Sequence, residues 1–146
     1  MILISHRGNI NGRHPVRENN PDYIQEALKG GYDVEIDVWC QDRGFALGHD
    51  EPQYAVEEAF LENDKLWCHA KNFKALGRML DNKQIHCFWQ QGDDFSLTSK
   101  NIIWTNISKE LGPQSICVLP ELRGITDKKS LPKCLGVCSD YISKFI

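Results

Sequence analysis

The sequence contains no long apolar run, no excess of basic charge and no low-complexity segment. Without a stretch of about 20 apolar residues, no membrane-spanning helix is expected. The formal net charge is -3, so the broad positive surface that binds nucleic-acid backbones is missing, and nucleic acid is not expected as a partner. The opening residues MILISHRG lack the basic and apolar regions of a signal peptide, and we expect a cytoplasmic protein.

The size and cysteine usage are those of an ordinary globular protein. The chain has 146 residues, of which 41% are hydrophobic, and we expect a single domain spanning residues 1–146. None of the six cysteines has a partner pair at zinc-ribbon spacing. Cys68, Cys87 and Cys117 lie in apolar, strand-like segments, which favours buried free thiols over disulfides.

Short apolar runs alternate with helical patterns in the first half of the chain, as in α/β proteins. The strands expected there are Ile2–Ser5, Val34–Trp39 and Leu66–His69. The expected helices are Pro21–Lys29, Ala55–Glu62 and Phe73–Leu80. Later strands are expected at Ile85–Trp89, Ile102–Thr105, Ile116–Leu119 and Val137–Tyr141. The connections between these later strands are too short for full-length helices.

Two pairs of polar residues are spaced so that both members share one face of a strand. Glu35 and Asp37 lie two positions apart inside an apolar strand, where they would repel each other unless a cation lay between them. This pattern predicts a divalent metal site, with a strand edge facing water as the alternative. His69 and Lys71 form a second such pair, which could supply a metal ligand and a phosphate-binding amine. A hydrogen-bonded core histidine is the alternative for His69.

Histidines also follow two other strand-like segments. His6 and Arg7 come directly after the first strand, and His49 precedes Asp50. Imidazole titrates nearest neutrality, so His6 and His49 are candidates for a general acid and a general base. The planar guanidinium of Arg7 suits a phosphate group. Each signal is weak alone, because histidines at strand ends are common.

Taken in order, these motifs resemble the glycerophosphodiester phosphodiesterase family. The resemblance covers residues 1 to about 75, and beyond them only the run from Gly136 to Tyr141 is similar, to the last barrel strand of the family. The matching motifs are His6-Arg7-Gly8, Glu18-Asn19, a helix ending in glycine, Glu35-x-Asp37, His49-Asp50 and a strand closed by Lys71.

The resemblance implies a reduced TIM-barrel-like (β/α) barrel and a metal-dependent phosphodiesterase acting on a glycerophosphodiester or a similar phosphodiester. One divalent ion (Mg, Ca, Mn or Zn) would be held by Glu35 and Asp37, with His69 as a further ligand, and two histidines would perform acid/base catalysis. The other residues implied or suggested for the site are His6 and His49 in catalysis, with Arg7, Lys71, Glu18 and Glu121 binding phosphate or substrate.

Two departures from the family pattern are visible. His69 stands where the family has a third carboxylate, which shifts the metal preference toward manganese or zinc. The chain is also short, because such barrels need about 200 to 250 residues. Helices should therefore be shortened or lost in the C-terminal half, leaving apolar surface for a covering segment or a second protomer. A noncatalytic protein that binds phosphate or sugar phosphate in the same fold is the alternative function.

Overall fold

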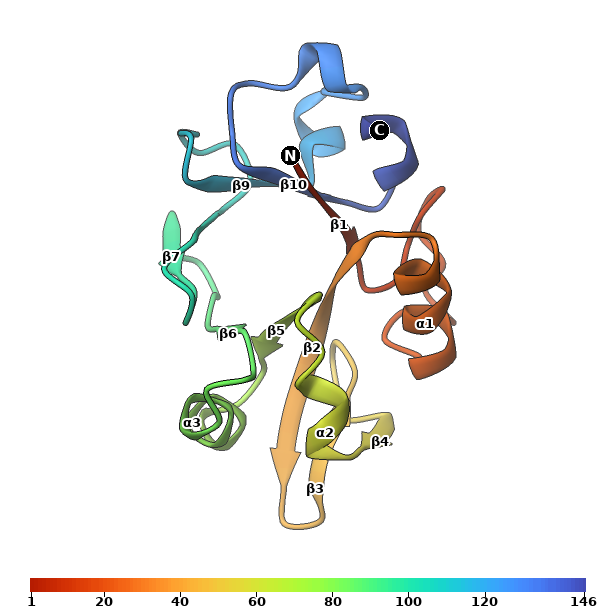
Figure 1. Ribbon diagram of the computed structural model, residues 1–146, viewed down its shortest axis with the longest axis vertical. Coiled ribbons are helices and arrows are strands. Elements are labelled where there is room, and N and C mark those ends of the chain that lie inside the picture. Colours follow the sequence, from red (N-terminus) through yellow and green to blue (C-terminus); the bar gives the residue numbers. More distant parts are fainter.

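The computed structural model describes residues 1–146 as one curled, ten-stranded sheet with three short α-helices (Figure 1). The strands are β1 (Ile2–His6), β2 (Asp33–Gln41), β3 (Gly44–Leu47), β4 (Tyr54–Val56), β5 (Leu66–Ala70), β6 (Cys87–Phe88), β7 (Phe95–Leu97), β8 (Ile103–Thr105), β9 (Ser115–Val118) and β10 (Gly136–Ser139). The α-helices are α1 (Pro21–Lys29), α2 (Glu58–Leu61) and α3 (Phe73–Asp81), and the 3-10 helices are η1 (Pro120–Arg123), η2 (Lys128–Ser130) and η3 (Ile142–Phe145).

The sheet is mixed, with a parallel centre and antiparallel additions. The parallel strands are neighbours in the order β6-β5-β2-β1-β10-β9-β8. Strand β2 is long enough to pair with β1 and β5 and, near its end, with β3 of a hairpin that continues to β4. Strand β7 lies antiparallel beside β8. The parallel strands all end at one edge of the sheet, which we call the carboxyl edge.

The expected TIM-barrel-like fold is wrong. A TIM barrel alternates strands and helices around the whole sheet, whereas here only α1 and α3 exceed a single turn, and the chain from β6 to the C-terminus contains only 3-10 helices. The expected helix Ala55–Glu62 is instead strand β4 followed by the one-turn helix α2. Tyr54–Val56 forms a strand because it pairs with β3. The turn that joins β2 to β3 contains Gly44, whose φ is 108°.

The two longer helices agree with the sequence patterns. Helix α1 has the expected bounds, because Pro21 occupies its first turn and the Asn20 side chain accepts a hydrogen bond from Asp22 N. Helix α3 is capped in the same way, since Asn72 accepts a hydrogen bond from Ala75 N. These local contacts explain why both helices could be predicted from sequence. Strand β7 was not predicted.

The sheet separates two apolar layers. On the outer face, α1 and α3 pack with β2 and β5 in a 16-residue cluster that includes Val34 and Ile36. On the inner face a smaller cluster surrounds Ile4, Trp67 and Trp104. Val34, Ile36 and Val38 of β2 belong to the outer cluster. Because side chains alternate along a strand, Glu35 and Asp37 between them face inward. They lie beyond the inner apolar cluster, toward the carboxyl edge.

The second half of the sheet carries apolar surface that no helix covers, as expected. Phe95 is 50% exposed and Leu97 64% exposed, and both line a cavity of about 500 Å³ with Ile103 and Leu111. A second protomer on this surface stays a prediction. All six cysteines are free thiols, and those predicted to be buried are buried. None of the helices combines the length and the apolar character needed to cross a membrane.

Candidate functional site

Three neighbouring parallel strands bring the polar residues of the first half together. In the register of the sheet, His6 of β1 pairs with Glu35 of β2, and Asp37 of β2 pairs with His69 of β5. All four side chains therefore meet on the inner face at the carboxyl edge, where parallel sheets commonly place their ligands.

The two carboxylates of β2 are almost fully buried and incompletely paired. Glu35 is 3% exposed and Asp37 is fully buried. Asp37 Oδ2 accepts a hydrogen bond from Asn19 Nδ2 at 2.9 Å and lies 2.8 Å from Arg7 Nε, in an ion pair without hydrogen-bond direction. Asp37 Oδ1 and Glu35 Oε2 have no hydrogen-bond partner. Leaving buried carboxylate oxygens unpaired is costly, so these atoms indicate the position of a ligand.

His69 turns one ring nitrogen toward these carboxylates. Its Nε2 lies 2.8 Å from the carbonyl oxygen of Gln90, which can only accept, so Nε2 carries the hydrogen. Nδ1 then faces Asp37 Oδ1 at 3.4 Å and Glu35 Oε1 at 3.6 Å. Burial lowers the pKa of His69, but the contacts with Asp37 and Glu35 outweigh burial and raise this pKa to about 9. A proton therefore occupies Nδ1 when no metal does.

The geometry of these residues fits one divalent cation. Ligand atoms of Glu35, Asp37 and His69 all lie within 4.8 Å of one another. Tetrahedral bonds of about 2.1 Å would place neighbouring ligand atoms about 3.4 Å apart, close to the two distances that join His69 Nδ1 to the carboxylates. The hydrogen bond from Nε2 to the carbonyl oxygen of Gln90 fixes the orientation of the ring, as the free ring nitrogen of a metal-bound histidine usually does by donating to a carbonyl or carboxylate. Two carboxylates and one imidazole suit manganese or zinc.

The other inner histidine is held by the carboxylate of the residue that directly follows the last strand. His6 Nδ1 lies 2.7 Å from Asp140 Oδ1, and His6 Nε2 lies 3.8 Å from Glu35 Oε2. Burial lowers the pKa of His6, but the hydrogen bond to Asp140 and the charge of Glu35 outweigh burial, and the pKa is raised. Burial raises the pKa of Asp140, but its bond to His6 outweighs this and lowers the pKa. An ionised Asp140 thus holds Nδ1 and leaves Nε2 directed into the site.

The loop from β1 to α1 is locked onto β2 by two left-handed residues. Arg7 (φ 55°) donates its backbone N–H to Glu35 O, and Asn19 (φ 63°) donates its own to Arg7 O. The Asn19 side chain also accepts a hydrogen bond from Asp37 N at 2.9 Å. Glu18 accepts a hydrogen bond from Arg7 Nη1 at 3.3 Å. The guanidinium is therefore fixed beside the carboxylates of β2.

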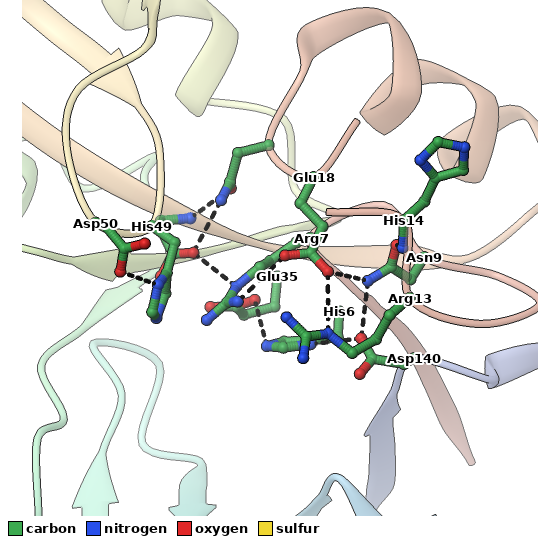
Figure 2. Close-up of polar contacts among 12 residues, drawn as sticks. His6, Arg7, Asn9, Arg13, His14, Glu18, Glu35, His49, Asp50 and Asp140 are labelled. Atoms are coloured by element: carbon green, nitrogen blue, oxygen red, sulfur yellow. Dashed lines mark hydrogen bonds and ion pairs between the residues drawn. The ribbon is translucent and has the colours of Figure 1, made fainter. Parts of the chain in front are cut away.

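Lys71 and His49 are the last two of the expected residues near these carboxylates. Lys71 Nζ lies 3.8 Å from Asp37 Oδ1. His49 is paired with Asp50 through Nδ1 at 2.7 Å, and Figure 2 shows this pair on one side of Arg7 and the His6–Asp140 pair on the other. Beside them is a cavity of about 360 Å³ without apolar side chains apart from a proline, lined by Arg7, Arg13, Pro15, Glu18, Asn19, His49, Asp50, Glu51 and Gln53.

Most of the residues expected at the site are close together, but Glu121 is placed differently. Its carboxylate accepts hydrogen bonds from Ser139 Oγ and from Asp140 N, each at 2.9 Å. Glu121 therefore braces the end of β10, and its contact with a substrate hydroxyl stays a prediction. The residues brought together are His6, Arg7, Glu18, Glu35, Asp37, His69 and Lys71, with His49 at the rim of the polar cavity.

Sequence reasoning gave no role to three residues that organise the site. Asn9 Nδ2 donates to Asp140 Oδ1 at 2.8 Å and to Glu18 Oε1 at 3.0 Å. Asn19 was visible beside Glu18 as part of a motif, and Asp140 was visible as a carboxylate closing the last strand. Asn9 had no such signal, because an amide in a loop usually serves a turn.

Comparisons of this chain with protein-family models, curated proteins and solved structures found no match. The resemblance to the glycerophosphodiester phosphodiesterases therefore stays a hypothesis.

Proposed function

We propose that this protein is a metal-dependent phosphodiesterase that hydrolyses a glycerophosphodiester or a similar phosphodiester. The observation that carries the proposal is a pair of buried carboxylates that each keep one oxygen without a hydrogen-bond partner. Asp37 Oδ1 lies 3.4 Å from His69 Nδ1, and Glu35 Oε2 lies 3.8 Å from His6 Nε2. A protein that needed these carboxylates only for structure would be expected to pair them fully.

Glu35, Asp37 and His69 would hold the divalent ion, and the basic side chains of Arg7 and Lys71 lie beside these ligands. A divalent ion supplies positive charge that polarises a phosphoryl group and lowers the pKa of bound water. Arg7 and Lys71 both contact Asp37. They offer donors to phosphate oxygens and so favour the charge that develops on those oxygens during substitution.

The two histidines supply the proton transfers. Water adds to phosphorus, one P–O bond breaks, and the proton lost by water is balanced by the proton gained by the leaving alkoxide. His6 suits the acid, because its raised pKa favours the protonated ring and Nε2 points toward Glu35. His49, at the rim of the polar cavity, would accept the proton from water.

The test is turnover of bis(p-nitrophenyl) phosphate and of glycerophosphodiesters by metal-stripped protein supplied with magnesium, manganese, calcium or zinc. We expect turnover with at least one ion, and a loss of about 10²- to 10⁴-fold in His6→Ala. In Glu35→Gln, calorimetry should show weaker binding of that ion. Asp81→Asn, an exposed carboxylate on α3 without an ion-pair partner, is the matched control and should change neither value.

The outcomes separate the two candidate functions. Metal and inorganic phosphate bound by the protein, with no turnover of any diester, would favour the noncatalytic phosphate-binding alternative. Equal metal affinity in wild type and Glu35→Gln would reject the metal site itself.

A further inference from the structure

One buried asparagine joins two of the carboxylates that surround the candidate site. Asn9, in the loop that follows β1, is fully buried. Its Nδ2 donates to Asp140 Oδ1 at 2.8 Å and to Glu18 Oε1 at 3.0 Å (Figure 2). Glu18 belongs to the same loop, whereas Asp140 directly follows β10. A single amide group therefore connects the two ends of the chain inside the site.

The acceptor side of the same amide is also fully used. Asn9 Oδ1 accepts a hydrogen bond from His14 N at 3.1 Å and another from Tyr23 Oη at 3.3 Å. An asparagine side chain has two donors and two acceptor positions, and all four are occupied here. Turning the amide over would set its oxygen against two carboxylates and its NH₂ group against the backbone N–H of His14. The orientation of the Asn9 side chain is therefore fixed.

On one side, Asn9 holds the partner of the proposed acid. The Asp140 oxygen that accepts the bond from Asn9 also lies 2.7 Å from His6 Nδ1. The backbone N–H of Asp140 donates separately to Glu121 Oε1 at 2.9 Å. The backbone and the carboxylate of Asp140 are thus held by different contacts. The carboxylate cannot rotate away from His6 without also losing its bond to Asn9.

On the other side, Asn9 holds the partner of the arginine. Glu18 Oε1 accepts the bond from Asn9, and Glu18 Oε2 accepts a bond from Arg7 Nη1 at 3.3 Å. Arg13 Nε lies 3.5 Å from Oε1, but the Arg13 side chain is 60% exposed, so its contact constrains the carboxylate less. The bond from Asn9 therefore keeps Oε2 directed at Arg7.

A role in loop structure alone explains only part of this pattern. An asparagine in a loop commonly bonds the backbone of its own turn, as Asn9 Oδ1 does with His14 N. Both donated bonds go instead to carboxylates that contact residues proposed to act on the substrate. Hydrogen bonds to ionised carboxylates are stronger than neutral ones. Loss of the amide would consequently release both carboxylates at once.

We propose that Asn9 is a positioning residue that keeps the proposed acid His6 and the phosphate-binding Arg7 in a fixed arrangement. It acts on His6 through Asp140 and on Arg7 through Glu18. The inference rests on the proposed function for the roles of these two residues. The proton donor and the guanidinium must be aligned with the same phosphoryl group, and a displacement of about 1 Å is enough to cost much of the rate.

The test compares two diesters that differ in their leaving group. p-Nitrophenolate leaves bis(p-nitrophenyl) phosphate as a stable anion and needs little help from an acid, whereas the alkoxide that leaves a glycerophosphodiester needs a proton. With the ion that supports wild-type turnover, Asn9→Ala should lower kcat for the glycerophosphodiester about 10- to 100-fold. The loss for bis(p-nitrophenyl) phosphate should be about tenfold smaller.

Binding of inorganic phosphate is the second measurement, and it does not depend on turnover. Calorimetry in the presence of the same ion should show about fivefold weaker binding by Asn9→Ala, because Glu18 no longer holds Arg7 in place. Urea denaturation establishes that the variant is folded. If Asn9→Ala is not folded, Asn9→Asp serves instead, because it keeps the size and the accepted bonds and loses both donors.

Asn11→Ala is the matched control. Asn11 lies in the same loop and also accepts a side-chain hydrogen bond, from Ser143 Oγ at 2.7 Å, but it is exposed and this bond involves neither carboxylate. It should change neither kcat nor the affinity for phosphate.

Each outcome decides the inference. An equal loss of kcat for the two diesters, or an unchanged affinity for phosphate, would overturn it and assign Asn9 to the stability of the loop. If the wild type binds phosphate but hydrolyses no diester, the proposed function fails, and the phosphate affinity of Asn9→Ala alone decides the inference. If the wild type hydrolyses diesters and Asn9→Ala behaves like Asn11→Ala, the proposed function stands and this inference fails.

Discussion

At the scale of single residues, the two histidines proposed for proton transfer, His6 and His49, differ in their surroundings. His6 is 9% exposed and is bound to a largely buried Asp140. The His49 side chain is 45% exposed, and the Asp50 side chain bound to it is 92% exposed. A charge partner acts more strongly in a buried pair, because less water screens it. The contact with Asp140 is therefore expected to act strongly on His6.

Replacing Asp140 by Asn tests this dependence. Asp140→Asn removes the charge that raises the pKa of His6, so this pKa should fall. An acid catalyst is lost as the pH rises through its pKa, and the alkaline limb of the kcat/KM profile should therefore move to lower pH. Turnover at neutral pH should fall about 10- to 100-fold.

The same substitution at the exposed pair is the control for Asp140→Asn. Asp50→Asn should move the profile little, since solvent screens that contact. An unchanged alkaline limb in Asp140→Asn would show that Asp140 does not set the protonation of His6.

At the scale of elements, two glycines have opposite requirements. Gly8 in the loop after β1 has φ 94°, and a Cβ there would lie 2.7 Å from Tyr23 Cδ1. Gly77 lies inside helix α3, and a Cβ there would meet no atom within 4 Å. Gly8 is thus required by backbone conformation and close packing, whereas Gly77 only weakens its helix.

Alanine substitutions at the two positions should shift stability in opposite directions. Gly8→Ala should lower the free energy of unfolding by about 1–3 kcal/mol, because it forces a left-handed alanine against Tyr23. Gly77→Ala should raise it by about 0.5–1 kcal/mol. Urea denaturation measures both changes, and a stabilising Gly8→Ala would show that the loop can take another conformation.

At the scale of the whole molecule, a buried histidine links β5 to the segment after β7. His86, 2% exposed, packs its ring at a tilt against Trp67, and its Nε2 lies at hydrogen-bond distance, 2.8 Å, from Thr98 Oγ1. Burial, together with the charge of Lys100, lowers the pKa of His86 from 6.5 to about 4. The folded state therefore holds His86 neutral in a range where the unfolded chain binds a proton.

Acidification should consequently destabilise the fold through His86. Between pH 6.5 and 4 the unfolded state binds more protons, so the free energy of unfolding falls as the pH falls. The loss should be about 1–3 kcal/mol, and little of it should occur above pH 6.5. Urea denaturation across this range measures it. His86→Gln, which cannot titrate, should flatten the dependence, and an equally steep profile in this variant would assign the acid sensitivity to other groups.

The sequence by itself determined the features that neighbouring residues satisfy. The bounds of α1 follow from Asn20 and Pro21, and the inward face of β2 follows from the alternation that puts Glu35 and Asp37 together. These patterns are readable because their energetic terms act over a few residues.

Tertiary structure alone decided the pairings between distant segments. Asp140 meets His6 across 134 positions of the chain, Glu121 turns to β10, and Tyr54–Val56 joins β3 as a strand where a helix was expected. The TIM-barrel expectation failed for the same reason, since local patterns do not show which strands pair. Strand pairing and burial depend on competition among residues far apart in sequence, and that competition is resolved only when the whole sheet forms.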